Sequence, residues 1–112
     1  MRGWVDSGAD PSEHGRTQRL AFSLFQKLLE IRLVEGNISL WLDGCLRKAR
    51  EVSGDHVLYL WTNVELMWEE HRLVEVRYTP ADRHLEVCLN GRNIRESDDV
   101  VVTDSTFEGF QK

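Results

Sequence analysis

Two histidine–glutamate pairs are the residues of this chain best suited to chemistry. Glu70 precedes His71, and Glu86 lies two positions after His84. A histidine beside a carboxylate can transfer protons when both groups occupy a cleft that shifts their pKa values. Spacing alone places neither pair in a cleft, and ion pairs on a solvated sheet surface explain such residues equally well. The sequence therefore favours a structural role over a catalytic role for both pairs.

Motifs for other kinds of chemistry are absent from the sequence. No histidine spacing typical of a zinc site occurs, and Cys45 and Cys88 lie far apart without a C-x-x-C motif. Asn90-Gly91-Arg92 lacks the repeated glycines of a phosphate-binding loop. We therefore predict no metal and no cofactor, and we expect both cysteines to be buried free thiols in a reducing cytoplasm.

Composition and charge narrow the kinds of partner. The 112 residues suit one domain, and the formal net charge is -5. This charge argues against a nucleic-acid surface, because phosphate binding needs a basic patch. No apolar run approaches the roughly 20 residues of a membrane-spanning helix, and the N-terminus lacks a secretory signal. We therefore expect a cytoplasmic protein that binds a basic protein partner through an acidic face.

Acidic and aromatic residues near the C-terminal end are the candidate partner-binding surface. We expect this region to serve a non-catalytic adaptor, inhibitor, immunity or chaperone role. Its residues are Asp98, Asp99, Asp104, Phe107, Glu108 and Phe110.

A small-molecule site or small enzyme is the alternative function. A sheet covered by helices could hold a pocket lined by aromatic side chains, with histidine supplying polarity. The residues of this pocket would be Trp41, Trp61, Trp68, Tyr78, His71 and His84. Self-association is compatible with either function, because a leucine-rich helical face could form a symmetric homodimer.

The clearest structural element is a β-meander from Arg72 to Arg95. Apolar residues occupy every second position in two runs, which places them on one face of each strand. These residues are Val74, Val76, Tyr78, Leu85, Val87 and Leu89. Pro80 to Arg83 predicts the first turn, and Asn90-Gly91 predicts a second, two-residue turn.

The N-terminal half has two competing interpretations. Apolar residues from Leu20 to Ile31 recur at spacings of three and four, which predicts an amphipathic helix. Residues 38–49 repeat that pattern, so Gly36-Asn37 would join two helices in an αα-hairpin. The competing interpretation pairs residues 30–34 with 38–42 as strands and keeps helices at 17–30 and 44–52. Gly44 inside the second helix favours the competitor, since glycine costs about 1 kcal/mol there. We prefer the helical interpretation.

Three shorter elements complete the chain. The apolar run from His56 to Trp61 predicts a buried central strand. Thr62 and Glu65 match a capping box, which predicts a short helix through Met67 and Trp68; a strand continuing past Val64 is the competitor. Residues 97–99 predict a turn, and residues 100–103 predict a last strand.

The expected fold class is therefore α+β. An N-terminal amphipathic helix or αα-hairpin would pack on a mostly antiparallel sheet that ends in the meander. Residues 1–15 would be a flexible arm, residues 16–103 a single domain, and residues 104–112 an acidic and aromatic tail.

Overall fold

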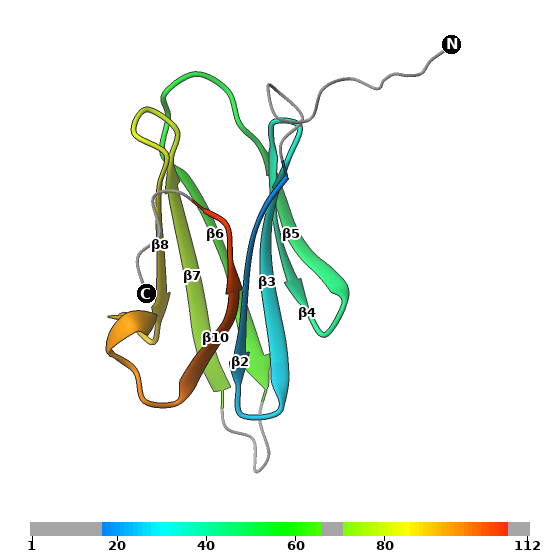
Figure 1. The fold of residues 1–112 in the computed structure, drawn as a ribbon, viewed down its shortest axis with the longest axis vertical. Helices are drawn as coiled ribbons and strands as arrows, with labels where there is room; N and C mark the ends of the chain where they lie inside the picture. The colour runs from blue at the N-terminus through cyan, green and yellow to red at the C-terminus, as the bar shows by residue number, and fades with distance from the viewer. Residues whose placement is uncertain (1–16, 66–70, 108–112) are drawn as a thin grey trace.

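The computed structural model describes residues 17–65 and 71–107, which form two packed antiparallel β-sheets (Figure 1). The first sheet has five strands, in the spatial order β10-β2-β3-β4-β5. Its strands are β2 (Gln18–Leu24), β3 (Lys27–Val34), β4 (Asn37–Leu42), β5 (Cys45–Glu51) and β10 (Val100–Ser105). The second sheet has four strands in sequence order. These are β6 (Leu58–Glu65), β7 (His71–Thr79), β8 (His84–Leu89) and β9 (Arg92–Asn93).

The expected α+β class is wrong, because the described residues form a β-sandwich. Their one helical element is the short 3-10 helix η2 (Ile94–Glu96). The stretch from Leu20 to Ile31, where we expected the first helix, lies in the β2–β3 hairpin instead. Leu20, Phe22 and Leu24 alternate into the core, and Leu29 and Ile31 do so on the next strand. The two alternating runs also contain spacings of three and four, which produced the misleading helical pattern.

The αα-hairpin is also wrong, and the competing hairpin at residues 30–42 is correct. Leu33 pairs with Ile38, and Val34 pairs with Asn37 across a two-residue turn. Glu35 and Gly36 in this turn have φ values of 51° and 79°. Two successive left-handed residues form the tight turn that matches strand twist, and glycine adopts this conformation readily. The expected helix at residues 44–52 is strand β5.

The meander from β7 to β9 is confirmed in its faces and turns, and the structure adds its register. Val76 pairs with Val87, and both have zero exposure between the sheets. Residues 80–83 form the first turn. Leu89 pairs with Arg92 across the two-residue Asn90-Gly91 turn. Alternation on both strands, together with strong turn residues, was sufficient to predict this part of the fold.

Strand β6 is an edge strand and not the buried central strand that we expected. It begins the four-stranded sheet, and its residues alternate between buried and exposed. The Thr62–Glu65 segment continues this strand, so the capping-box prediction is wrong and the strand competitor is correct for these residues. Met67 and Trp68 lie outside the described residues.

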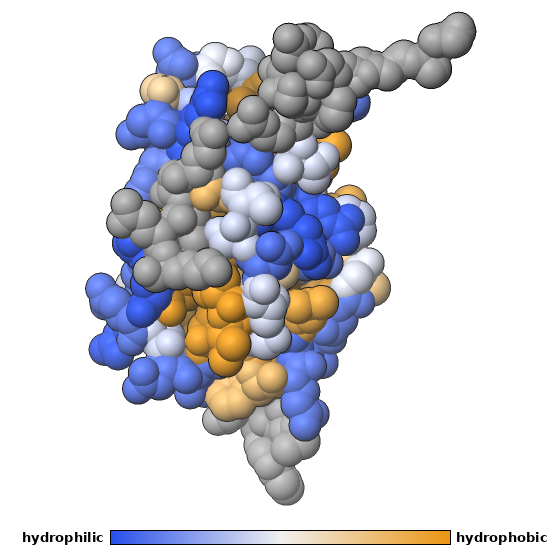
Figure 2. All heavy atoms as spheres, viewed as in Figure 1, coloured by the Kyte–Doolittle hydropathy of each residue, from blue (hydrophilic) through white to orange (hydrophobic). Residues whose placement is uncertain are grey.

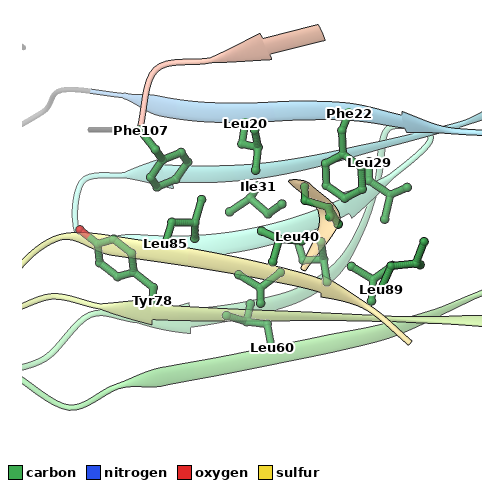
Figure 3. Close-up of a cluster of buried hydrophobic side chains, with 14 of the residues drawn as sticks. Leu20, Phe22, Leu29, Ile31, Leu40, Leu60, Tyr78, Leu85, Leu89 and Phe107 are labelled. Carbon is green, nitrogen blue, oxygen red and sulfur yellow. The ribbon is translucent and has the colours of Figure 1, made fainter. Parts of the chain in front are cut away.

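A continuous apolar core fills the space between the two sheets (Figure 3). Phe22, Leu40 and Leu60 are at most 1% exposed within it. Phe107, which we assigned to the tail, is 4% exposed and packs edge-on against Tyr78, with ring centroids 6.2 Å apart. The packed body therefore extends through β10 to Phe107. Within the described residues, none of the helical structure has the length and hydrophobicity needed to cross a membrane.

Candidate functional site

The side chains of the alternative aromatic pocket are spread over several surfaces. Trp41 lies on the outer face of the five-stranded sheet, and Trp61 lies on the outer face of the four-stranded sheet. Tyr78 is buried between the sheets. His71 and His84 are exposed at opposite ends of the β7–β8 hairpin, because His84 pairs with Thr79 at the far end of β7. The structure does not bring these five residues together, and Trp68 lies outside its described part.

The side chains that could transfer protons or bind a metal are also separated. Glu86, the partner that we considered for His84, faces the Arg77 guanidinium at 3.7 Å. Across residues 17–65 and 71–107, no three histidine, cysteine, aspartate or glutamate side chains form a group that could hold a metal ion. Both cysteines are free thiols; Cys88 is buried as expected, whereas Cys45 is exposed. Burial raises the pKa of the Cys88 thiol.

The predicted partner-binding residues have different environments. Asp98 and Asp99 are exposed in the turn before β10. Asp104 lies within β10 and accepts a hydrogen bond from Arg19 at 2.8 Å. Phe107 belongs to the core. Glu108 and Phe110 lie outside the described residues, so two of the six are available for contact on the described surface without disturbing an internal interaction.

A charge network on the outer face of the five-stranded sheet accounts for Asp104. Glu30 is buried, and its carboxylate accepts hydrogen bonds from Arg19 at 2.6 Å and from Arg32 at 3.0 Å. Burial alone would raise the pKa of Glu30, but these two arginines outweigh it and lower the pKa. The Arg32 guanidinium lies 4.2 Å from the centre of the Trp41 ring. These groups satisfy one another, which indicates a structural role.

An exposed apolar surface occurs at the β2–β3 end of the sandwich. Phe25 is 54% exposed, Leu28 is 37% exposed and Val101 is 61% exposed. Val101 and Leu28 both pair with Ser23, so they flank it on the outer face of the sheet. We name Phe25, Leu28 and Val101 the Phe25 patch. Figure 2 shows hydrophobic surface gathered over β10 and this end of the molecule.

Phe25 occupies a backbone conformation that suits glycine better than phenylalanine. It begins the two-residue turn between Leu24 and Lys27, with a φ of 56°. A left-handed conformation costs a side chain with a β-carbon roughly 1–2 kcal/mol. The exposed ring does not recover this cost in the core; it lies 5.9 Å from the Arg72 guanidinium carbon. Four other non-glycine turn residues in the described part of the chain also have a positive φ, namely Glu35, Asp43, Arg83 and Asn90. Phe25 is the one large apolar residue among these five, and bulky side chains rarely adopt this conformation, so its turn is strained.

The acidic turn lies directly beside the Phe25 patch. Val100 pairs with Leu24, so the preceding Asp99 lies next to the Phe25 turn. Asp98 and Asp99 are exposed, and in the described part of the chain neither carboxylate forms an ion pair. The patch therefore combines exposed apolar side chains with two carboxylates on one side.

Sequence reasoning found the acidic turn and missed its apolar neighbours. Phe25 and Leu28 were assigned to the buried stripe of a helix, and Val101 to a strand without a stated face. One signal could have identified Phe25: reading residues 18–24 and 27–33 as alternating strands leaves Phe25 and Gln26 as the connecting turn. The pairing of β10 with β2 had no comparable signal.

The architecture defines the class of the molecule, which is an antiparallel β-sandwich with its exposed side chains on sheet faces and turns. Comparison of the chain with protein-family models, with curated proteins and with solved structures found no match. A function must therefore be argued from the surface chemistry described above.

Proposed function

We propose that this protein is a non-catalytic protein-binding domain whose Phe25 patch receives a basic partner. The observation that carries this proposal is the exposure of Phe25 in a strained turn, next to two other exposed apolar side chains. Aromatic residues are enriched among the side chains that dominate binding energy at protein interfaces. A turn that keeps phenylalanine where glycine would be more stable is consistent with a contact made by that ring.

Charge supports a basic partner at this surface. Asp98 and Asp99 border the patch, and the chain as a whole carries a net charge of -5. Opposite charge at the rim of an interface accelerates association and selects among partners more than it adds affinity. A partner with an apolar centre and lysine or arginine around it fits this arrangement. An adaptor, inhibitor, immunity or chaperone role would each use such a contact.

Affinity capture with matched variants tests the proposal. The wild-type chain, Phe25→Gly and the double variant Asp98→Asn/Asp99→Asn would each be used as bait, with bound proteins identified by mass spectrometry. The control is Asp55→Asn/Asp82→Asn, which removes one exposed carboxylate from the β5–β6 connection and one from the β7–β8 turn. Both connections lie at the end of the sandwich opposite the β2–β3 turn (Figure 1). We expect the wild type and the control to capture a basic protein. We expect Phe25→Gly and Asp98→Asn/Asp99→Asn to fail to capture the same protein.

Binding of the captured protein would then be measured by calorimetry at several salt concentrations. We expect Asp98→Asn/Asp99→Asn to weaken binding at low salt and to reduce its salt dependence, because exposed charge pairs are screened by ions. Capture that is equal for all baits, or a partner with an acidic contact surface, would refute the proposal.

A further inference from the structure

Strand β5 extends beyond the core of the sandwich. All seven of its residues are exposed, although a strand in the body of a sandwich buries every second residue. It is the last strand of the five-stranded sheet, and β4 is its sole backbone partner among the described strands. Strand β6 approaches this edge at Arg47, whose guanidinium donates to the Thr62 hydroxyl at 3.1 Å. The outer backbone groups from Ala49 to Glu51 are therefore the ones available for pairing with a further strand.

The other sheet edges are less suitable for strand addition. A register shift between Val102 and Asp104 interrupts β10, and β9 has two residues. The edge of β6 is occupied in part by Arg47, whose guanidinium donates to the Asn63 carbonyl oxygen at 3.4 Å. The β4–β5 pairing also has one shift in register, but it falls before Lys48. The pairing is regular from Lys48 to Glu51.

The side chains of β5 carry positive charge in an acidic chain. Arg47, Lys48 and Arg50 lie within seven residues, against the single carboxylate of Glu51. Lys48 also lies 4.9 Å from the centre of the Trp61 ring, which is 41% exposed. Cations on an edge strand disfavour pairing with another copy of the same strand, because like charges would lie opposite one another. An acidic segment would meet the opposite charge.

We propose that β5 accepts an extended acidic segment of a partner protein as an added strand. Lys48 and Arg50 share one face of β5, and Ala49 lies on the other. The added segment would therefore alternate acidic residues, which face Lys48 and Arg50, with small apolar residues, which face Ala49. This surface is separate from the Phe25 patch, so a basic and an acidic partner could be held at once.

Nuclear magnetic resonance of the full chain with a defined probe tests strand addition. The probe is a ten-residue peptide of alternating glutamate and valine, and its control is the corresponding lysine–valine peptide. We expect the acidic peptide to shift amide signals of residues 45–51 and to slow hydrogen exchange at alternate amides there. The lysine–valine peptide should have no effect.

Three variants separate charge from backbone pairing. Lys48→Glu/Arg50→Glu should weaken binding of the acidic peptide at least about tenfold, whereas Lys48→Arg/Arg50→Lys should keep it. Ala49→Pro removes an amide proton without changing charge and should also weaken binding, with core signals showing that the fold persists. Unchanged signals in residues 45–51, or shifts without slower exchange, would overturn strand addition. If the chain self-associates without peptide and the β5 amides are then protected from hydrogen exchange, the strand that pairs with β5 is a second copy of the chain. That result would overturn the acidic segment as the occupant.

Discussion

Phe25 shows how one residue can reduce stability while serving recognition. Its φ of 56° is a conformation that glycine adopts without strain. We expect Phe25→Gly to raise the free energy of unfolding by about 1 kcal/mol, because relief of strain exceeds the added chain entropy. Chemical denaturation would measure the change.

The Asn90-Gly91 turn provides the reverse control for this prediction. Gly91 has a φ of 84°, and a β-carbon there would meet no atom within 4 Å. Gly91→Ala should therefore destabilise the protein by about 1 kcal/mol through backbone strain alone. If Phe25→Gly instead lowers stability, the Phe25 ring contributes to the folded state and the argument for recognition fails.

Glu30 gives stability a dependence on pH. The Arg19 and Arg32 hydrogen bonds outweigh burial and hold the folded-state pKa of Glu30 below its unfolded value. The stabilisation that the charged Glu30 carboxylate gives the fold is therefore fully present at pH values above its pKa in the unfolded state. It is lost as the pH falls through its lower pKa in the folded state. We expect Glu30→Gln to cost about 1–2 kcal/mol at neutral pH and progressively less in acid.

Denaturation curves collected at several pH values would test this expectation. Glu75→Gln is a useful comparison, because Glu75 accepts a hydrogen bond from the exposed Tyr59 hydroxyl and not from an arginine pair. A Glu30→Gln penalty that stays constant from neutral to acid pH would show that the charge on Glu30 does not stabilise the fold.

At the scale of elements, strand β10, Thr106 and Phe107 are part of the packed body. Phe107 is 4% exposed, and the Thr106 amide donates to the Arg19 carbonyl oxygen at 2.8 Å. Phe107→Ala should cost about 3 kcal/mol in unfolding free energy, because a buried aromatic ring leaves a cavity. Thermal or chemical unfolding measures the loss.

An exposed residue of β10 controls for this experiment. Val101→Ala removes a side chain that is 61% exposed and should change stability by about 0.5 kcal/mol or less. Equal effects of the two substitutions would show that Phe107 does not pack in the core.

The elements that sequence reasoning predicted correctly are those with local signals. Between Val74 and Leu89 the apolar alternation is interrupted by residues that favour turns, and the meander followed directly. The β2–β3 turn consists of Phe25 and Gln26, which contain no glycine, proline or asparagine. Without a turn signal, two strands resembled one continuous helix.

The candidate site was less predictable because it joins distant parts of the chain. The Ser97-Asp98-Asp99 turn is hydrophilic and its exposure followed from composition. Its position beside Phe25 depends on the pairing of Val100 with Leu24, which no local pattern indicates. Hydrophobic periodicity identifies which face of a strand is buried. It does not identify which other strand lies beside it in the sheet.

At the scale of the whole molecule, a sandwich closed by distant pairing should fold slowly. β10 pairs with β2, so the first sheet joins both ends of the described chain. Non-local β pairing places folding times in the range of milliseconds to seconds, because loop closure precedes the stabilising contacts. Stopped-flow refolding monitored by tryptophan fluorescence would measure this rate. Completion within microseconds would indicate the helix-rich architecture that the structure excludes.

The β2–β10 pairing also affects how the protein is made. On a ribosome, β2 emerges before β10, and the strand that covers its outer edge is translated only from residue 100 onward. Throughout that interval, the nascent chain carries an open strand edge able to bind other unfinished chains. Translation that stalls before residue 100 would therefore yield a fragment whose uncovered β2 edge promotes aggregation.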